Sequence, residues 1–196
     1  MQQLILATQN AGKVKEMSDL LQGLPYTLRT AKSAGFTDDV EETGATFQDN
    51  AGIKAETISA ALHAWAVADD SGLVVDALDG APGVHSARFS GEQATDASNN
   101  AKLLQLLHST PAKLRTARFV SVIALARPDM PTLYFEGVCE GTVLEAPLGD
   151  GGFGYDPLFV PCGEELTYAE LSAERKNMIS HRGIAMRKLC AFLQTL

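Results

Sequence analysis

The segment "ALHAWAVADDSG" (residues 61–72) predicts a central β-strand that ends in two adjacent acidic residues. Its mostly apolar run stops at a turn signal, which is typical of a strand buried in a sheet. Asp69 and Asp70 therefore lie where the strand reaches the boundary of the core. Because neighbouring carboxylates repel each other and burial disfavours their charge, this position requires an explanation.

A divalent cation is one explanation for the acidic pair. Mg²⁺ typically takes one or two carboxylates together with substrate phosphates and waters. A second acidic pair, Glu41–Glu42, precedes the next helix upstream and offers a further ligand. The alternative is that Asp69 and Asp70 only begin an Asx-type turn at the end of the strand. The spacing of the residues leaves both interpretations open.

The segments around this strand predict an α/β protein built on a mixed sheet. Alternating and apolar runs predict strands, and apolar residues at helical spacing predict helices. The predicted strands are residues 3–8, 26–31, 72–78, 117–126, 132–143 and 157–161, with a sharp turn at Ser71–Gly72. The predicted helices are residues 13–22, a helix that begins near Thr46, residues 96–108 and residues 183–195.

The helix that begins near Thr46 carries a start signal and a placed lysine. Thr46 and Asp49 have the spacing of a capping box, with Asp in the place of Glu. Lys54 falls beside Phe47 at the margin of the apolar stripe. A lysine there can lay its stem on apolar surface and extend its ammonium into a neighbouring cleft.

Composition limits the classes of partner. The chain has 196 residues, of which 45% are hydrophobic and 20% charged, with a net charge of -8. This balance argues against binding to nucleic acid or to an anionic membrane surface. It permits a small anionic ligand if a metal ion or lysines neutralise that ligand. No linker or internal repeat divides the sequence, so we expect one domain over residues 1–196.

Cysteine usage and the apolar runs predict a cytoplasmic protein. The three cysteines are far apart and lack CxxC spacing, which favours free thiols in a reducing compartment. The start "MQQLILATQN" lacks the basic region of a signal peptide. The apolar run "VSVIALA" (residues 120–126) is far shorter than the ~20 residues of a membrane helix.

The segment "ATQNAGK" (residues 7–13) lies at a strand-to-helix junction and ends in Gly-Lys. It fails the Walker A pattern at Ala7 and Val14, so it is not a P-loop. A helix start still offers free N–H groups, to which Thr8, Asn10 and Lys13 add side-chain donors suited to a phosphate. The alternative is an ordinary capped helix with a solvated lysine.

Two further segments offer groups that suit a nucleobase. "GDGGFG" (residues 149–154) matches a dinucleotide fingerprint, but a strand rather than a helix follows it, so the match is rejected. Its Phe153, with Tyr155, either stacks on a flat ring or packs in the core. "SHRG" (residues 180–183), with Lys176, either decorates the surface or reads the oxygens of a base edge.

Taken together, these segments resemble the inosine/xanthosine triphosphate pyrophosphatase family. The resemblance rests on "ATQNAGK", "EETGATFQDNAGIKA", "VADDSGLVVDALDGAPGVHSARFSG", "GGFGYDPLF" and "SHRG", and runs from Thr8 to Gly183. It implies Mg²⁺-dependent hydrolysis of ITP, dITP and XTP to the monophosphate and pyrophosphate. It also implies an elongated α/β fold, whose long mixed sheet carries two lobes flanking a central cleft, and a homodimer.

The resemblance also implies a role for particular residues. Asp70 is the general base and a metal ligand, with Asp69 and Glu41 completing the metal site. Ser71 contacts substrate. The phosphate contacts are Thr8, Asn10, Lys13 and Lys54; the base-binding loop is Phe153, Gly154, Tyr155 and Asp156; the groups at the base edge are Lys176, His181 and Arg182. Donors at that edge would accept a 6-oxo purine and reject adenine.

Two other functions compete with this interpretation. One is a pyrophosphatase for other modified nucleotides, such as pyrimidines, against which the "FGYD" and "SHRG" segments argue. The other is a nucleotide-binding module without turnover, against which Asp69, Asp70 and Glu41 argue, because binding alone requires no base.

Overall fold

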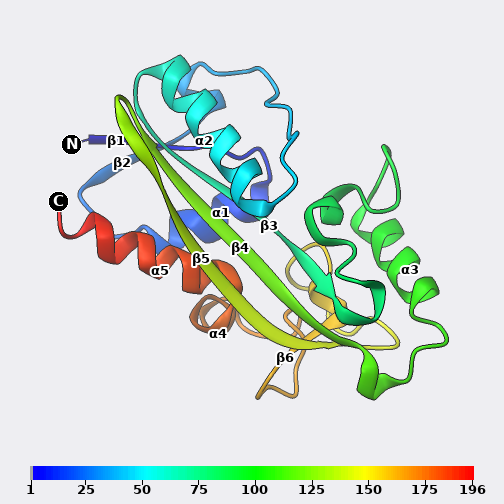
Figure 1. Cartoon of the computed structure of the whole chain (residues 1–196). Coiled ribbons are helices and arrows are strands. Elements are labelled where there is room, and N and C mark those ends of the chain that lie inside the picture. Colours follow the sequence, from blue (N-terminus) through cyan, green and yellow to red (C-terminus); the bar gives the residue numbers. More distant parts are fainter. Residues whose placement is uncertain (1) are drawn as a thin grey trace. The chain divides into compact units, whose positions relative to one another are not determined.

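The structure is a computed structural model that describes residues 2–196 (Figure 1). Its strands are β1 (Gln2–Leu6), β2 (Tyr26–Thr30), β3 (Trp65–Val75), β4 (Thr116–Arg127), β5 (Met130–Val143) and β6 (Phe159–Pro161). Its α-helices are α1 (Ala11–Leu20), α2 (Phe47–Leu62), α3 (Asp96–Leu106), α4 (Ala173–Ile179) and α5 (His181–Leu193). Short 3-10 helices include η3 (Gly83–Arg88) and η5 (Asp156–Leu158).

The strands form a mixed six-stranded sheet in the order β2-β1-β3-β4-β5-β6. Strand β1 pairs in parallel with both β2 and β3, and β5 pairs antiparallel with β6. The prediction of an α/β protein around a mixed sheet is confirmed.

The chain divides into two compact units. The first unit holds the described residues up to Asp70, together with Ser121–Gly137 and Arg182–Leu196. The second unit holds Ser71–Val120 and Val138–His181. Strands β3, β4 and β5 contribute residues to both units.

In the first unit, helices cover both faces of the sheet (Figure 1). Successive side chains of a strand point to opposite faces, and the core residues separate accordingly. On β3, Val67 packs with residues of α1 and α5, whereas Ala66 and Ala68 pack with residues of α2. The alternation explains why the strand reads as a continuous apolar run, because both of its faces are buried.

The second unit has its own core, in which α3 packs on the distal halves of the long strands. Leu103 and Leu107 join Leu73 and Val75 of β3 in this cluster. The aromatic rings of Phe119, Phe159 and Tyr168 also pack in this cluster.

Most predicted elements are present, but residues 76–78 and 157–158, predicted as strand, lie in 3-10 helices. Two further differences concern a turn and a helix. The predicted turn at Ser71–Gly72 is wrong, because β3 continues through both residues to Val75. The alternation of buried Leu73 and Val75 after the aspartates keeps the strand on the sheet. Helix α4 was not predicted, since its short segment carries charged residues instead of an apolar stripe.

The predicted capping box is confirmed at the start of α2. The Thr46 hydroxyl accepts from the Asp49 N–H at 3.1 Å, and the Asp49 carboxylate accepts from the Thr46 N–H at 3.1 Å. Cys139, Cys162 and Cys190 carry free thiols. Within residues 2–196, no helix has both the length and the apolar character that a bilayer crossing requires.

Candidate active site

Asp69 and Asp70 lie side by side on β3 but face different helices. Asp69 shares the face of Val67, toward α1 and α5, and Asp70 shares the face of Ala66 and Ala68, toward α2. Both side chains are buried, with exposures of 1% and 6%. The two carboxylates therefore meet different side chains, although both lie in the first unit.

The carboxylate of Asp69 is surrounded by donors. Ser121 Oγ donates to Oδ1 at 2.6 Å, and Lys13 Nζ and Arg182 Nη2 lie 2.8 and 3.1 Å from Oδ2. Burial alone would raise the pKa of Asp69, but Arg182, Lys13 and Ser121 outweigh burial and hold this pKa well below its usual range. Asp69 is therefore ionised at neutral pH and holds the two cations in place.

The carboxylate of Asp70 is satisfied on one side only. Its Oδ1 lies 3.2 Å from Nζ of Lys54, whereas its Oδ2 is buried and has no hydrogen-bond partner. Burial raises the pKa of Asp70, and the attraction of Lys54 and Lys13 does not fully offset it. A buried acceptor without a partner is unfavourable, so Oδ2 is suited to a group that binds from outside the chain.

Helix α2 delivers Lys54 to this carboxylate. The ammonium also lies 2.7 Å from Oε1 of Glu42 and donates to the main-chain oxygen of Asp69 at 3.0 Å. Burial opposes the charge, but Asp70 and Glu42 outweigh burial and raise the pKa of Lys54. The placement of Lys54 at the edge of the apolar stripe, predicted from its spacing, is confirmed by its half-buried side chain.

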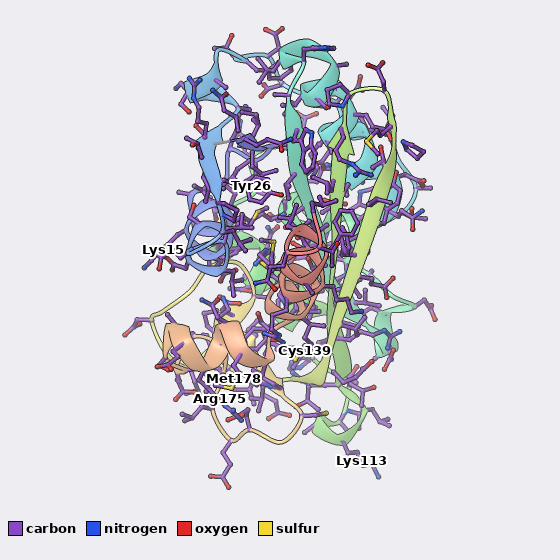
Figure 2. The ribbon with its side chains drawn as sticks, turned by 90° about the vertical axis from the view of Figure 1, so that its left-hand side faces the viewer. Lys15, Tyr26, Lys113, Cys139, Arg175 and Met178 are labelled. Atoms are coloured by element: carbon purple, nitrogen blue, oxygen red, sulfur yellow. The ribbon has the colours of Figure 1, made fainter. Side chains whose placement is uncertain are left out.

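The β1–α1 turn forms a conventional helix start, and Lys13 lies in the first turn of α1. Asn10 is the N-cap, its side chain accepting from the Lys13 N–H at 3.0 Å, and the Thr8 hydroxyl accepts from the Asn10 N–H at 3.2 Å. The side chain of Lys13 turns inward to Asp69, which excludes the solvated-lysine alternative. Lys15, on the same helix, is exposed and points outward (Figure 2).

Burial and neighbouring cations change the acidity of Lys13. Burial lowers the pKa of Lys13, Arg182 and Lys54 lower it further, and the attraction of Asp69 does not fully compensate. An ammonium held in this way is stabilised by any additional anion that approaches it.

Arg182 lies in the acidic cluster of the first unit. Its guanidinium forms ion pairs with Asp69 and with Glu16 of α1. Burial would lower the pKa of Arg182, but these carboxylates outweigh it and raise the pKa. The resemblance predicts Arg182 at the base edge beside His181, but Arg182 belongs to the first unit and His181 to the second.

Sequence reasoning missed two members of this cluster, Glu16 and Ser121. Glu16 follows Lys13 by three residues on α1, the spacing at which side chains share a helix face, and this signal was available. Ser121 lies within the apolar strand β4, and only its hydrogen bond to Asp69 in the folded chain identifies it.

In the second unit, the glycine loop, which comprises residues 149–156, carries a buried ion pair. Asp156 Oδ2 lies 2.6 Å from Lys176 Nζ and accepts from the Phe153 N–H at 2.9 Å. The ammonium of Lys176 lies 5.0 Å from the centroid of the half-buried Phe153 ring. One carboxylate thus fixes both the backbone of the loop and the cation beside its aromatic ring.

The structure separates the two aromatic residues of this loop. Tyr155 is a core residue at 4% exposure, and its hydroxyl donates to the Ser86 oxygen at 2.9 Å. Phe153 is only half-buried, so its ring is the more accessible of the two. His181 is buried and stacks on Phe119, with ring centroids 4.6 Å apart and planes 11° apart.

The remaining predicted residues are placed as follows. Ser71 follows Asp70 on β3 and belongs to the second unit. Glu41 is exposed, and it is Glu42 that contacts Lys54. Gly154 lies on the loop with a left-handed φ of 61°.

One hollow of the first unit lies apart from these residues. It has a volume of about 480 Å³ and lies between α2 and the β4–β5 connection. Its lining includes Glu56, His63 and Asp129, and none of the predicted site residues. This hollow is therefore not part of the candidate site.

Comparisons with known proteins match nearly the whole chain. The model of the Ham1 family matches residues 4–192. The chain is 52% identical to a dITP/XTP pyrophosphatase of Desulforamulus reducens, covering 98% of this chain and 96% of that protein. It is 47% identical to a dITP/XTP pyrophosphatase of Halalkalibacterium halodurans, covering 98% and 100%. The solved structure of a HAM1 protein from Coxiella burnetii matches with a TM-score of 0.92 and 41% identity, covering 100% of both chains.

Proposed function

The chain belongs to the Ham1 family, and we propose that it hydrolyses non-canonical purine nucleoside triphosphates such as dITP and XTP. The products are the nucleoside monophosphate and pyrophosphate. The relatives named dITP/XTP pyrophosphatase are identical to the chain at about half of its positions and over almost its full length. Within the site, the observation that carries the proposal is the buried Oδ2 of Asp70, which has no partner and lies on a carboxylate held by Lys54.

The residues present fit a magnesium ion that uses few protein ligands. Oδ2 of Asp70 is an oxygen donor of the type that Mg²⁺ prefers. Across residues 2–196 no group of three or more His, Cys, Asp or Glu side chains is arranged to hold a metal. Mg²⁺ commonly completes its coordination with waters and substrate phosphates, which suits such a site. When bound, the ion would neutralise phosphate charge and lower the pKa of a bound water.

Charge balance supports the requirement for a divalent cation. The carboxylates of the first-unit cluster outnumber its cations: Glu16, Glu42, Asp69 and Asp70 against Lys13, Lys54 and Arg182. A triphosphate would be repelled by this balance without a metal ion. We assign Asp70 as the protein ligand and Asp69 as the residue that holds Lys13 and Arg182, and Glu41 stays a predicted ligand.

The chain's own groups then divide the chemistry. Lys13 and Lys54 stabilise negative charge on the phosphoryl oxygens as it develops. Asp70 orients the attacking water and accepts its proton. Attack at the α-phosphorus breaks the bond to the β-phosphate, so pyrophosphate leaves and the monophosphate remains.

A separate set of residues is assigned to the base. Phe153 offers a stacking face, and Lys176 and His181 offer donors to a 6-oxo group. Adenine presents an amino group at that position, and two facing donors reject each other. We propose this as the reason for selection of hypoxanthine and xanthine.

We also infer that the protein acts in the cytoplasm, which its cysteine usage supports, and that it forms a homodimer, which rests on the family resemblance alone. Light scattering coupled to size-exclusion chromatography tests the dimer directly. A monomeric mass at micromolar concentration contradicts it.

One assay separates the proposed function from its competitors. The protein is incubated with Mg²⁺ and ITP, XTP, dITP, ATP, GTP or dUTP, and pyrophosphate is quantified, with EDTA as the metal-free control. Turnover of ITP, XTP and dITP that EDTA abolishes supports the proposal. Turnover confined to dUTP supports a pyrimidine enzyme, and tight binding without pyrophosphate supports a binding module.

A matched pair of lysine variants tests whether turnover depends on the charged residues around Asp69 and Asp70. Lys13→Ala removes the buried ammonium beside Asp69, whereas Lys15→Ala removes an exposed one from the same helix. Loss of turnover in the first variant and wild-type turnover in the second are expected. Equal rates in both variants would contradict the phosphate-binding role of Lys13.

A further inference from the structure

The peptide groups of Gly154 are held on both sides by helix α3. The Gly154 N–H donates to Asp96 Oδ2 at 2.7 Å, and the Gly154 oxygen accepts from Asn100 Nδ2 at 3.0 Å. Asp96 and Asn100 are four residues apart, so they lie on one face of the helix. A single helix face therefore holds both polar groups of one loop residue.

These two bonds complete a set that fixes the glycine loop. The preceding N–H, that of Phe153, donates to Asp156 at 2.9 Å, and the Gly151 N–H donates to the Ala169 oxygen at 3.2 Å. Gly154 itself has φ of 61°, and nothing lies within 4 Å of where its Cβ would be. The conformation at Gly154 therefore depends on hydrogen bonds rather than on packing.

Helix α3 is itself firmly anchored on the second unit. Its start carries a capping box, in which Thr95 and Ser98 exchange hydrogen bonds. The buried Asn99 accepts from the Ser90 N–H at 2.7 Å and donates to the Ala87 oxygen at 3.1 Å. The helix can hold the loop in place because its own position is set independently of Asp96 and Asn100.

We propose that Asp96 and Asn100 are positioning residues for the base-binding loop. This inference rests on the proposed function. Neither side chain is assigned a contact with the base; they hold Gly154, and Gly154 fixes the ring of the adjacent Phe153. A loop ordered before binding loses less entropy when the base stacks, so its restraints strengthen base binding.

The test uses purified full-length variants with dITP and Mg²⁺. Asn100→Ala and Asp96→Ala should each raise KM about 5-fold, the effect of one lost hydrogen bond, with kcat unchanged. Asp96→Asn keeps an acceptor for the Gly154 N–H and should restore a KM near that of the wild type. Gln105→Ala, an exposed position on the same helix, is the matched control and should change nothing.

A second measurement distinguishes weaker binding of the base from a general loss of structure or of phosphate binding. Inorganic tripolyphosphate has no base, so its inhibition constant against dITP should be the same in the wild type and in Asn100→Ala. Thermal unfolding verifies that α3 is intact, since alanine favours helix more than asparagine does.

The outcomes distinguish this inference from the proposed function. A folded Asn100→Ala with wild-type KM overturns the positioning role, as does an equal weakening of dITP and tripolyphosphate. An equal rise in KM for Asp96→Asn and Asp96→Ala also overturns it. A wild-type protein inert toward dITP and XTP overturns the proposed function, and the inference with it.

Discussion

The ammonium of Lys54 lies 3.2 Å from Oδ1 of Asp70, and it leaves the buried Oδ2 of the same carboxylate without a partner. The lysine is divided between Asp70 and Glu42, so its charge does not fully compensate the burial of Asp70. Natural proteins retain such unfavourable groups where function requires them. This relationship makes the site testable through stability as well as through activity.

The substitution Asp70→Asn should abolish most turnover of dITP, with a smaller loss of binding because one protein ligand of the magnesium ion is weakened. Removal of a general base typically lowers kcat by about 10²–10⁴-fold. Steady-state kinetics measures kcat, and calorimetric titration with dITP and Mg²⁺ measures binding. A variant with the wild-type kcat would refute the role of Asp70.

The same substitution should raise the melting temperature. The pKa of Asp70 is raised in the folded chain above its ordinary value of 3.8, first because of burial. The stability that this carboxyl contributes is present below pH 3.8 and is lost as pH rises through the folded pKa. At pH 7 the ionised group therefore destabilises the fold, and asparagine removes that charge. A lower melting temperature for Asp70→Asn would contradict this sign.

Asp69→Asn should have the opposite effect on stability. The pKa of Asp69 is held well below 3.8, because Arg182 and Lys13 outweigh its burial. Its stabilisation is present above pH 3.8 and is lost as pH falls through the folded pKa. Breaking the buried pair should cost about 3 kcal/mol at pH 7.

Guanidinium denaturation at pH 7 and at pH 3 checks this prediction. The difference between wild type and Asp69→Asn should shrink at the lower pH. Asp19→Asn, an exposed change on α1, is the control and should alter stability by less than about 0.5 kcal/mol. A pH-independent difference would show that Asp69 acts other than through its charge.

Gly152→Ala should disturb the base-binding loop more than Gly163→Ala does. Both glycines have positive φ, at 71° and 85°, so each substitution carries backbone strain of about 1–2 kcal/mol. At Gly152 a Cβ would also lie 2.0 Å from Asp156 Oδ2, whereas Gly163 has open space. Displacing that carboxylate breaks its bonds to Phe153 and Lys176, and KM for dITP should rise about 10-fold. Equal KM values for the two variants would exclude Asp156 from base binding.

Phe153→Ala should raise KM about 10-fold with little change in kcat. Stacking on the base stabilises the ground state and the transition state alike, so its loss weakens binding without slowing chemistry. Phe153→Leu retains apolar volume without a flat face and should give an intermediate KM. A fall in kcat at constant KM would be incompatible with stacking.

Hydrophobic spacing alone determined most of the elements of this protein. The helix over residues 47–62, its capping box and the position of Lys54 follow from local rules of period and hydrogen bonding. The prediction from the sequence is wrong where a local turn signal competes with burial, because β3 continues through Ser71 and Gly72. The buried Leu73 and Val75 beyond them hold the strand on the sheet.

Motif resemblance identified which residues matter, and tertiary structure decided what surrounds each of them. Asp69 and Asp70 are neighbours in sequence, yet strand geometry turns them to opposite faces and to different lysines. Their pKa values consequently shift in opposite directions. Arg182 follows His181 directly, but its guanidinium lies against Asp69 and Glu16 of the first unit, while the His181 ring stacks in the second. Sequence spacing cannot supply this information, because the charges that decide each group's state come from segments distant along the chain.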